Sequence, residues 1–351
     1  MTIAIFVKNL TSGGAEKQSV LLAKELSKFY NVHYLIFNGK KIHEKYINSL
    51  KETNSIIIKS FEGFWINRFV ELVKYLKNNE ISFVFSYLTG ANMTASIASV
   101  FVKNKVYVGL RNARLPFAKL WLDRIATNMF SKGAVANCYS GRDYFISHGF
   151  KKWKIYVVHN CFDVVASLPK IPHTNIKIIT VGRFVPQKDY ETLIHAFAVL
   201  RKTVQNTELH IVGYGELERN VREWVAKYDV VDNTYIHINP NNISELLNTS
   251  DIYLSTSLFE GTSNSIMEAM NAELPIVATN VGDNAFLVHE GKNGFLCAVK
   301  DYNSISNALK VLVNSKAMRD KFGKEGKQLL QNDFSVEFFS EKYRILIENA
   351  G

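Results

Sequence analysis

Residues 257–270 read S-L-F-E-G-T-S-N-S-I-M-E-A-M. An apolar run of strand length (D-I-Y-L-S-T, 251–256) precedes this stretch, and helical periodicity continues from its second half to Ala272. We therefore predict a buried strand, an exposed loop of small polar residues, and a helix. A strand that ends in such a loop presents backbone N–H groups at the positive end of a helix dipole, which is a favourable place for a phosphate.

Two carboxylates, Glu260 and Glu268, stand eight positions apart in this stretch. A carboxylate accepts hydrogen bonds from hydroxyls. A glycoside hydrolase needs its two carboxyl groups roughly 5–10 Å apart, whereas eight residues along one helix span about 12 Å. The spacing favours the two ends of an elongated ligand, such as a sugar attached to a phosphate. The alternative is structural, with one acid at a helix N-terminus and one in solvent.

Arg183 and Lys188 form a second candidate pair, in the loop after the apolar run 176–181. Open α/β sheets bind ligands at the carboxyl ends of their strands. An arginine fork and a lysine ammonium in that position can together hold a diphosphate. The alternative for these two cations is a solvated surface.

The N-terminus repeats the strand–loop–helix order, with an apolar run at 3–7, a Thr11-Ser12-Gly13-Gly14 loop and a helical pattern over 15–30. Thr11 or Ser12 is a candidate helix cap. The loop is either a second phosphate cradle or a tight turn without a ligand. It is not G-x-G-x-x-G, so a nicotinamide site has no support.

Apolar runs and helical periods alternate along the whole chain of 351 residues, which predicts an α/β fold with two domains and parallel sheets covered on both faces. We place the first domain at 1–165 and the second at 166–333, because the segment around 163–175 contains two prolines between apolar strands. The charge balance also changes there. Residues 1–165 carry 23 Lys and Arg against 10 Asp and Glu, a net charge of +13, and the remainder carries a net charge of −3.

The basic half predicts an anionic partner. Residues 111–132 combine Arg and Lys with apolar residues, as an amphipathic helix on an anionic membrane would. A second candidate for membrane contact comprises Phe61, Phe64, Trp65 and Phe69, followed by Lys74 and Lys77. The alternative for both segments is a surface helix that packs its apolar side on the sheet. No nucleic-acid motif accompanies the charge.

Other classes find little support. The apolar runs are too short for a transmembrane helix, and the N-terminus does not resemble a signal peptide. Three widely spaced cysteines predict structural thiols in a reducing compartment. Because D-x-D and H-E-x-x-H motifs and Cys or His clusters are missing from the sequence, we expect no metal and no cofactor.

Together these motifs resemble glycosyltransferase family 4, which consists of retaining enzymes with the GT-B architecture of two facing Rossmann-like domains and an interdomain cleft. The 257–270 stretch and the following L-P-I-V-A-T-N-V-G-D-N look like the family signature. The other similar segments, in the family's order, are T-S-G-G-A-E (11–16), V-V-H-N-C-F-D (157–163), V-G-R-F-V-P-Q-K-D-Y (181–190), G-Y-G-E-L (213–217) and G-K-N-G-F-L (291–296).

The resemblance implies a role for each matching residue. Glu260 would bind donor-sugar hydroxyls near the reacting face, Glu268 would hold the ribose, and Arg183 with Lys188 would stabilise the departing diphosphate. It implies further donor contacts from Gly13, Gly14, Gly261, Thr262, Ser263, Asn264 and Ser265. It also implies that a final helix at about 334–351 packs back on the first domain.

Two departures from the family leave the sugar open, and a third leaves the nucleotide open. Many members carry a donor-contacting His in the first domain, where this chain has Arg111 and Asn112. Phe286 stands where an acidic residue is common, and Ile238-Asn239-Pro240 replaces a more usual glycine near the base.

We therefore expect a metal-independent hexosyltransferase that moves a hexose or N-acetylhexosamine from a nucleoside diphosphate sugar, with UDP favoured. The expected acceptor is a polyprenyl-linked or growing glycan of a bacterial O-antigen or capsule. The expected location is cytoplasmic and peripheral, on the inner face of the plasma membrane. The alternatives are a nucleotide-sugar 2-epimerase of the same fold and a non-catalytic glycan- or lipid-binding partner of another transferase.

Overall fold

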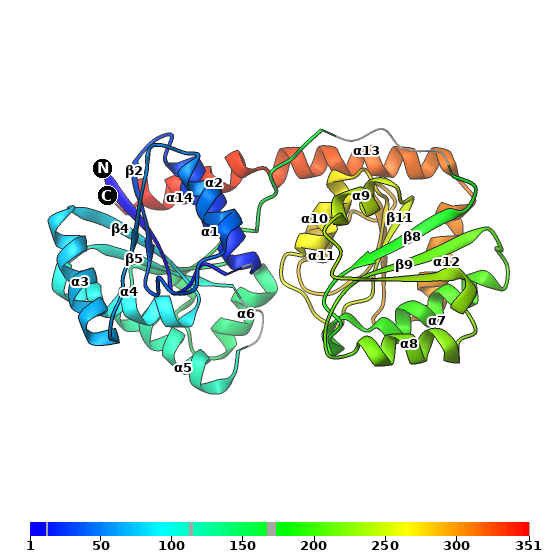
Figure 1. Cartoon of the computed structure of the whole chain (residues 1–351), viewed down its shortest axis with the longest axis horizontal. Helices are drawn as coiled ribbons and strands as arrows, with labels where there is room; N and C mark the ends of the chain where they lie inside the picture. Colours follow the sequence, from blue (N-terminus) through cyan, green and yellow to red (C-terminus); the bar gives the residue numbers. More distant parts are fainter. Residues whose placement is uncertain (12, 112–114, 167–172, 351) are drawn as a thin grey trace. The chain divides into compact units, whose positions relative to one another are not determined.

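The computed structural model describes residues 1–11, 13–111, 115–166 and 173–350 (Figure 1). The structure divides into two compact units. The first unit comprises Met1–Asp163 and Ser335–Gly351, and the second is Val164–Phe334. The first segment thus ends two residues before the expected boundary at 165, and the last helix belongs to the first unit.

Within the described residues, the first unit contains a parallel sheet of seven strands in the order β3-β2-β1-β4-β5-β6-β7. The strands are β1 (Thr2–Val7), β2 (Asn31–Ile36), β3 (Ile56–Ser60), β4 (Ile81–Tyr87), β5 (Lys105–Leu110), β6 (Gly133–Ala136) and β7 (Ile155–Val157). In register, Ile3 of β1 pairs with Val32 of β2 on one side and with Phe83 of β4 on the other. The central strands are almost wholly buried, as a sheet covered on both faces requires.

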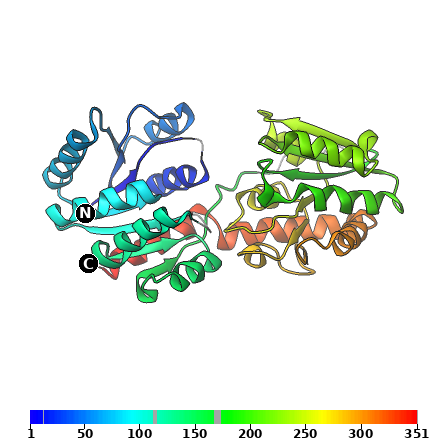
Figure 2. The ribbon, with the colours of Figure 1, turned by 90° about the horizontal axis from the view of Figure 1, so that it is seen from below.

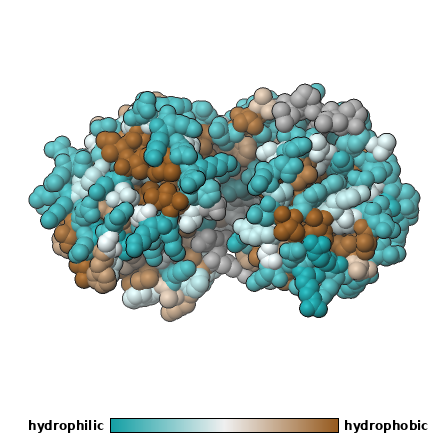
Figure 3. Space-filling model, viewed as in Figure 1, coloured by the Kyte–Doolittle hydropathy of each residue, from teal (hydrophilic) through white to brown (hydrophobic). Residues whose placement is uncertain are grey.

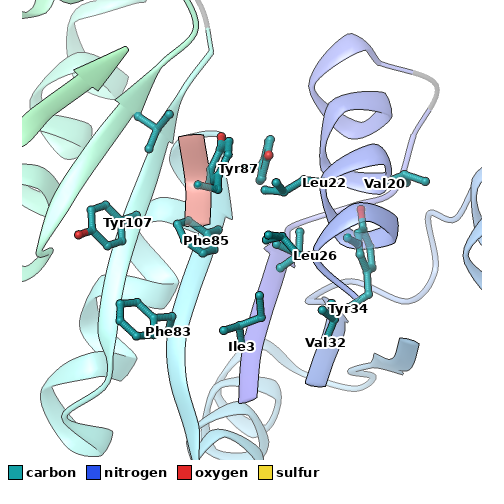
Figure 4. Close-up of a cluster of buried hydrophobic side chains, with 14 of the residues drawn as sticks. Ile3, Val20, Leu22, Leu26, Val32, Tyr34, Phe83, Phe85, Tyr87 and Tyr107 are labelled. Atoms are coloured by element: carbon teal, nitrogen blue, oxygen red, sulfur yellow. The ribbon is translucent and has the colours of Figure 1, made fainter. Parts of the chain in front are cut away.

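Helices cover both faces of this sheet. They are α1 (Gly14–Leu26), α2 (Glu44–Lys51), α3 (Trp65–Asn78), α4 (Thr89–Val102), α5 (Phe117–Ile125), α6 (Tyr139–Ser147) and α14 (Val336–Glu348). Helices α1, α2 and α14 pack on one face, and α3 to α6 pack on the other. Figure 4 shows Leu22 and Leu26 of α1 lying over Ile3 and Phe85 in the first of these two cores.

The second unit has a parallel sheet in the order β10-β9-β8-β11-β12-β13, six strands among the residues described. The strands are β8 (Ile176–Val181), β9 (Thr207–Gly213), β10 (Thr234–Ile238), β11 (Ile252–Ser255), β12 (Ile276–Thr279) and β13 (Gly294–Cys297). The helices are α7 (Tyr190–Arg201), α8 (Glu218–Lys227), α9 (Ile243–Asn248), α10 (Asn264–Asn271), α11 (Asn284–Leu287), α12 (Tyr302–Val313) and α13 (Lys316–Asp333). One core packs α7, α8 and α12 against the sheet.

Each sheet reverses its strand order once, between β1 and β4 in the first unit and between β8 and β11 in the second. The ribbon in Figure 2 can be followed from β1 to one edge of the first sheet and then back across to β4. Because the connections leave in opposite directions at such a switch point, they leave room for a ligand at the carboxyl ends of the two strands.

Three local expectations differ from the structure. The first helix ends at Leu26, before the expected 30, and the described part of 111–132 contains only the short α5 and a π-helical turn at Ala126–Phe130. Phe61 was expected as a membrane contact, and this was wrong, because it is 0% exposed in the sheet core. Phe64 and Trp65 are exposed, as a surface contact would require.

Candidate functional site

The loop after β11 is tied to the loops after the neighbouring strands. The Thr256 hydroxyl lies 3.0 Å from the backbone oxygen of Lys188 and 2.9 Å from that of Asp189, both after β8. On the other side, Thr279 of β12 donates from Oγ1 to the backbone oxygen of Ser257 at 2.6 Å. These bonds between buried hydroxyls and backbone fix three strand ends relative to one another.

Glu260 and Lys188 form an ion pair across the switch point of the second unit. Lys188 Nζ lies 2.5 Å from Glu260 Oε1, and Ser257 Oγ donates to the same oxygen at 2.7 Å. The side chains of Lys188 and Glu260 are only 18% and 10% exposed. A carboxylate offers about four acceptor positions, so Glu260 retains capacity for a further hydroxyl. The pair places a positive and a negative group side by side, where a sugar phosphate would need both.

Gly282 lies directly against the backbone of Glu260. It has φ of 56°, and a Cβ built on it would lie 2.1 Å from the Glu260 carbonyl oxygen. Only glycine fits a position with this φ and this close an approach.

Arg183 lies on a loop that packs closely against Gly213 and Gly215 at the end of β9. Phe184 accepts a backbone hydrogen bond from Leu217 at 3.0 Å and donates one to Tyr214 at 2.7 Å. Gly215 has φ of 152°, and a Cβ there would lie 2.5 Å from the Phe184 oxygen. The Arg183 side chain is exposed on this fixed loop, in contrast to the paired Lys188.

The N-terminus of α10 faces the same group of loops. Ser263 is its N-cap, without a side-chain cap hydrogen bond, and the hydroxyls of Ser263 and Ser265 lie 3.2 Å apart. Thr262 and Ser263 are buried, whereas Gly261, Asn264 and Ser265 are half-buried. The Ser263 side chain therefore does not cap the helix, and the α10 N-terminus is the positive end of the helix dipole.

Tyr253 of β11 is buried near both predicted carboxylates, Glu260 and Glu268. Its hydroxyl lies 3.3 Å from the backbone oxygen of Val181. Burial raises the pKa of Tyr253, a hydrogen bond from Ser265 opposes this, and the nearby charges of Glu268 and Glu260 raise it further. Glu268, in the second turn of α10, and Glu260 thus lie around one buried tyrosine that the sequence analysis did not single out.

The N-terminal glycines lie at the start of α1 in the first unit. Gly13 is the N-cap, with φ of −75°, and Gly14 is the first helical residue. The Glu16 carboxylate folds back on this turn, because a Cβ on Gly13 would lie 2.3 Å from Glu16 Oε2. Thr11 Oγ1 donates to Glu16 Oε1 at 2.7 Å. Thr11 therefore holds the Glu16 side chain and does not cap the helix, and Ser12 lies outside the described residues.

Arg111 lies after β5, packed against aromatic rings. Its guanidinium carbon is 4.6 Å from the centre of the Tyr87 ring, and it donates a hydrogen bond to the hydroxyl of Tyr343 on α14. Two of its nitrogen atoms, Nε and Nη1, are buried without a hydrogen-bond partner. Asn112, the other candidate at this place, lies outside the described residues. Arg111 therefore joins α14 to the first sheet, and a sugar contact stays a prediction.

The structure thus brings together Glu260, Lys188, Glu268 and the α10 N-terminus in the second unit, with Arg183 on an adjacent loop. Sequence reasoning missed Ser257, Tyr253 and Gly282, which hold these groups. The only signal for them was their place next to predicted strand ends. Among the described residues, no group of three or more His, Cys, Asp or Glu residues could hold a metal ion.

Comparison with known proteins agrees with this architecture of two Rossmann-like, parallel-sheet units, which is the GT-B class. Alr3699/HepE of Anabaena, solved in complex with UDP, superposes with a TM-score of 0.85 at 17% identity, covering 99% of this chain and 100% of that one. TarM of Staphylococcus aureus gives a TM-score of 0.76 at 15% identity, covering 98% and 99%.

Residues 168–329 match the family model of glycosyl transferases group 1. An uncharacterized glycosyltransferase of Haemophilus influenzae is 25% identical over 97% of this chain and 98% of its own length. A Campylobacter jejuni relative is 22% identical, with 93% of each chain covered, and is named N-acetylgalactosamine-N,N'-diacetylbacillosaminyl-diphospho-undecaprenol 4-alpha-N-acetylgalactosaminyltransferase. No helix in the described part of this chain is long and apolar enough to cross a bilayer.

Proposed function

We propose that this glycosyltransferase is a metal-independent, retaining hexosyltransferase that uses a UDP-sugar in the synthesis of a bacterial surface polysaccharide. The observation that carries the proposal is the buried Lys188–Glu260 pair at the β8–β11 switch point, beside the uncapped α10 N-terminus. The solved complex of HepE with UDP supports the choice of nucleotide.

In this proposal the donor lies along the carboxyl ends of β8 and β11. Glu260 accepts from sugar hydroxyls, and Lys188 and Arg183 neutralise the diphosphate as the glycosidic bond breaks. Groups that are already in place where charge develops in the transition state give the largest electrostatic effect. Glu268 binds the ribose, and the N–H groups at residues 262–265 bind the sugar and phosphate. The acceptor hydroxyl oxygen bonds to the anomeric carbon on the face that the diphosphate leaves, and its proton passes to the departing phosphate oxygen. The product therefore keeps the anomeric configuration of the donor, without a covalent enzyme intermediate.

The proposed acceptor is a polyprenyl-linked or growing glycan. The Campylobacter relative is named for transfer to a diphospho-undecaprenol glycan, and a Staphylococcus aureus relative, 26% identical over 49% of this chain, is named as a capsular polysaccharide glycosyltransferase. Both names support a lipid-linked or polymeric acceptor. The acceptor then reaches the enzyme at the cytoplasmic membrane surface.

We further propose that the outer side of α3, α4 and α5 contacts that membrane, and we call it the apolar helix surface. Its exposed large apolar residues are Phe64, Trp65, Ile66, Val70, Ile97, Val100, Phe101, Phe117 and Trp121. The rings of Phe69 on α3 and Phe101 on α4 lie 6.3 Å apart, so these two helices meet along their outer sides. Figure 3 shows apolar patches along the lower edge of the first unit, where Figure 1 places these helices. Anionic lipid complements the net charge of +13 in residues 1–165.

Calorimetric titration with UDP, GDP and ADP in the presence of EDTA tests the proposed donor site. We expect UDP to bind most tightly, and Arg183→Ala to weaken that binding. The control variant is Arg219→Ala, because Arg219 is an exposed arginine of α8 on the same unit. Absence of binding by all three nucleotides to the folded protein would contradict the proposal.

A further inference from the structure

The Glu260 carboxylate is held by the protein through one of its two oxygens. Lys188 Nζ lies 2.5 Å from Oε1, and Ser257 Oγ donates to the same Oε1 at 2.7 Å. A carboxylate oxygen offers about two acceptor positions, so these donors occupy both positions of Oε1. Within the part of the chain that the structure describes, Oε2 accepts no hydrogen bond. One oxygen of this carboxylate therefore serves the fold, and the other is left for a ligand.

Ser257 determines which oxygen is left. The terminal torsion of a glutamate side chain has a broad energy minimum, so a carboxylate with a single partner turns easily about it. With Lys188 as its only partner, the carboxylate can share the ammonium group between both oxygens, and Oε2 then loses capacity for a ligand. Ser257 is 0% exposed, and its backbone oxygen accepts from Thr279 Oγ1 of β12 at 2.6 Å. Its hydroxyl is therefore fixed in place and restricts the rotation of the carboxylate.

Gln187 ties the turn that carries Lys188 to the loop that carries Glu260. Its side-chain Nε2 donates to the Phe259 backbone oxygen at 2.8 Å, and its own backbone oxygen accepts from Leu258 N at 2.8 Å. The two bonds run in opposite directions between the turn and the loop. Because the next residue along each segment is a member of the charged pair, this double contact sets the separation of their backbones. Gln187 was not a candidate from the sequence.

We propose that Ser257 and Gln187 are positioning residues of the donor site, and that Glu260 offers only its Oε2 to the donor sugar. Ser257 keeps Oε2 free of protein contacts, and Gln187 keeps Lys188 at the right distance from Glu260. This inference rests on the proposed transferase function, because it names the groups that orient the same site. It goes further in giving the two oxygens of Glu260 different roles.

The two positioning residues act on different parts of the donor. In the proposed arrangement Glu260 contacts the sugar and not the nucleotide, so loss of the Ser257 hydroxyl weakens the binding of a UDP-sugar and leaves the binding of UDP almost unchanged. Gln187 also holds the turn of Lys188, which neutralises the diphosphate. Loss of its side-chain amide therefore weakens the binding of UDP as well.

The test of Ser257 is calorimetric titration with UDP and with UDP-glucose, UDP-galactose, UDP-N-acetylglucosamine and UDP-N-acetylgalactosamine. The UDP-sugar that the wild type binds most tightly is the probe for the variants. Ser257→Ala should bind UDP within about twofold of the wild type and the UDP-sugar about tenfold more weakly, since a hydrogen bond at a charged group contributes about tenfold. Ser306→Ala, which removes another buried hydroxyl from α12 of the same unit, is the matched control and should bind both like the wild type.

A second variant at position 257 separates the hydrogen bond from the fold. Ser257→Cys keeps a side chain of similar shape with a weaker donor, so its affinity for the UDP-sugar should lie between those of the wild type and Ser257→Ala. Thermal unfolding of each variant shows whether it is folded. If Ser257→Ala does not fold, Ser257→Cys decides, and an affinity equal to that of the wild type would overturn the role of Ser257.

The test of Gln187 uses the same titrations with Gln187→Met, which keeps the length of the side chain and removes its amide. We expect about tenfold weaker binding of both UDP and the UDP-sugar. Gln205→Met is the matched control, because Gln205 also donates to a backbone oxygen, that of Arg201 at 3.1 Å, but at an exposed position. Unchanged UDP binding in Gln187→Met would overturn the role of Gln187.

The remaining outcomes are distinct from a failure of the transferase function. Equal losses for UDP and the UDP-sugar in Ser257→Ala would overturn the separate roles of the two oxygens, because a general loosening of the loop weakens both. Unchanged binding of the UDP-sugar in this variant would overturn them too, while the function stands. If the wild type binds neither UDP nor any of the UDP-sugars, the proposed function fails and this inference fails with it.

Discussion

In the second unit, Lys188 and Glu260 meet across the switch point at 2.5 Å. In the first unit, Lys8, Lys119 and Glu16 line a hollow between β1 and β4, and no ion pair joins them among the described residues. Both sheets reverse their strand order at this point. The charged side chains of the second unit are already paired there, whereas those of the first unit are not. A site that stabilises a transition state gains from fixed charges, which is the property of the second unit.

The largest effect is expected when the fixed pair is broken. Glu260→Gln removes the negative charge that Lys188 and Ser257 contact, and we expect sugar transfer to fall by about 10²–10³-fold, as for the loss of one fixed group in other enzymes. Release of UDP from a UDP-sugar with acceptor measures the rate. Glu223→Gln, an exposed glutamate of α8, is the control. Unchanged turnover in Glu260→Gln would contradict a role of Glu260 in transfer, and the absence of turnover in the wild type as well would favour the non-catalytic alternative.

The next largest effect is expected at Gly282, which lies against the backbone of Glu260. Gly282→Ala combines a positive φ with a Cβ 2.1 Å from the Glu260 oxygen, so we expect it to destabilise the protein by on the order of 3 kcal/mol. Gly291 has φ of 70° but no neighbouring atom within 4 Å of its Cβ, so Gly291→Ala should cost only about 1 kcal/mol. Urea unfolding gives both values. Equal losses would mean that the contact with Glu260 does not constrain the loop.

The sequence predicted the strands, loops and helices around these glycines, but not the contacts between the loops. The alternation of apolar runs and helical periods predicted both sheets, and the 257–270 stretch predicted the strand, loop and α10. The partners of Glu260 could not be predicted, because Ser257 and Lys188 reach it only after three strands align. The hollow in the first unit was missed for the same reason, since Lys8 belongs to no motif and Lys119 was considered only as part of the basic, apolar segment 111–132.

A smaller effect is expected from Asp123, a buried acid that contacts the start of α4 in the first unit. Asp123 of α5 accepts hydrogen bonds from Asn92 Nδ2 at 2.9 Å and from Thr89 Oγ1 at 2.7 Å. Burial raises its pKa to about 6, although these two bonds and the charge of Lys119 oppose the rise. The folded protein thus binds the proton more tightly than the unfolded chain, so stability is lost as pH rises from about 4 to about 6.

Asp123→Asn removes this titration. Relative to the variant, the wild type should lose about 2–3 kcal/mol of unfolding free energy between pH 4 and pH 7, since one pKa unit corresponds to about 1.4 kcal/mol. Urea unfolding of both proteins across that range measures the difference. A difference that does not change with pH, or that changes with the opposite sign, would show that Asp123 is not held in its neutral form.

The smallest effect is expected at the apolar helix surface. This surface belongs to the first unit alone, so it gives a further difference between the two units. Phe64→Ser/Trp65→Ser/Phe117→Ser removes three exposed rings, and we expect about tenfold weaker flotation with phosphatidylglycerol vesicles. Val231→Ser, an exposed apolar residue of the second unit, is the control. Equal flotation of the wild type with anionic and with phosphatidylcholine vesicles would remove the electrostatic part of the membrane proposal.

Amide hydrogen exchange with and without UDP tests the central claim most directly, namely that the nucleotide binds at the switch point of the second unit and not at that of the first. With UDP, the largest slowing of exchange should occur at residues 262–266, at the start of α10. Exchange at residues 89–92, at the start of α4, should slow much less. Slowing at α4 that exceeds the slowing at α10, or no slowing at α10, would contradict the account.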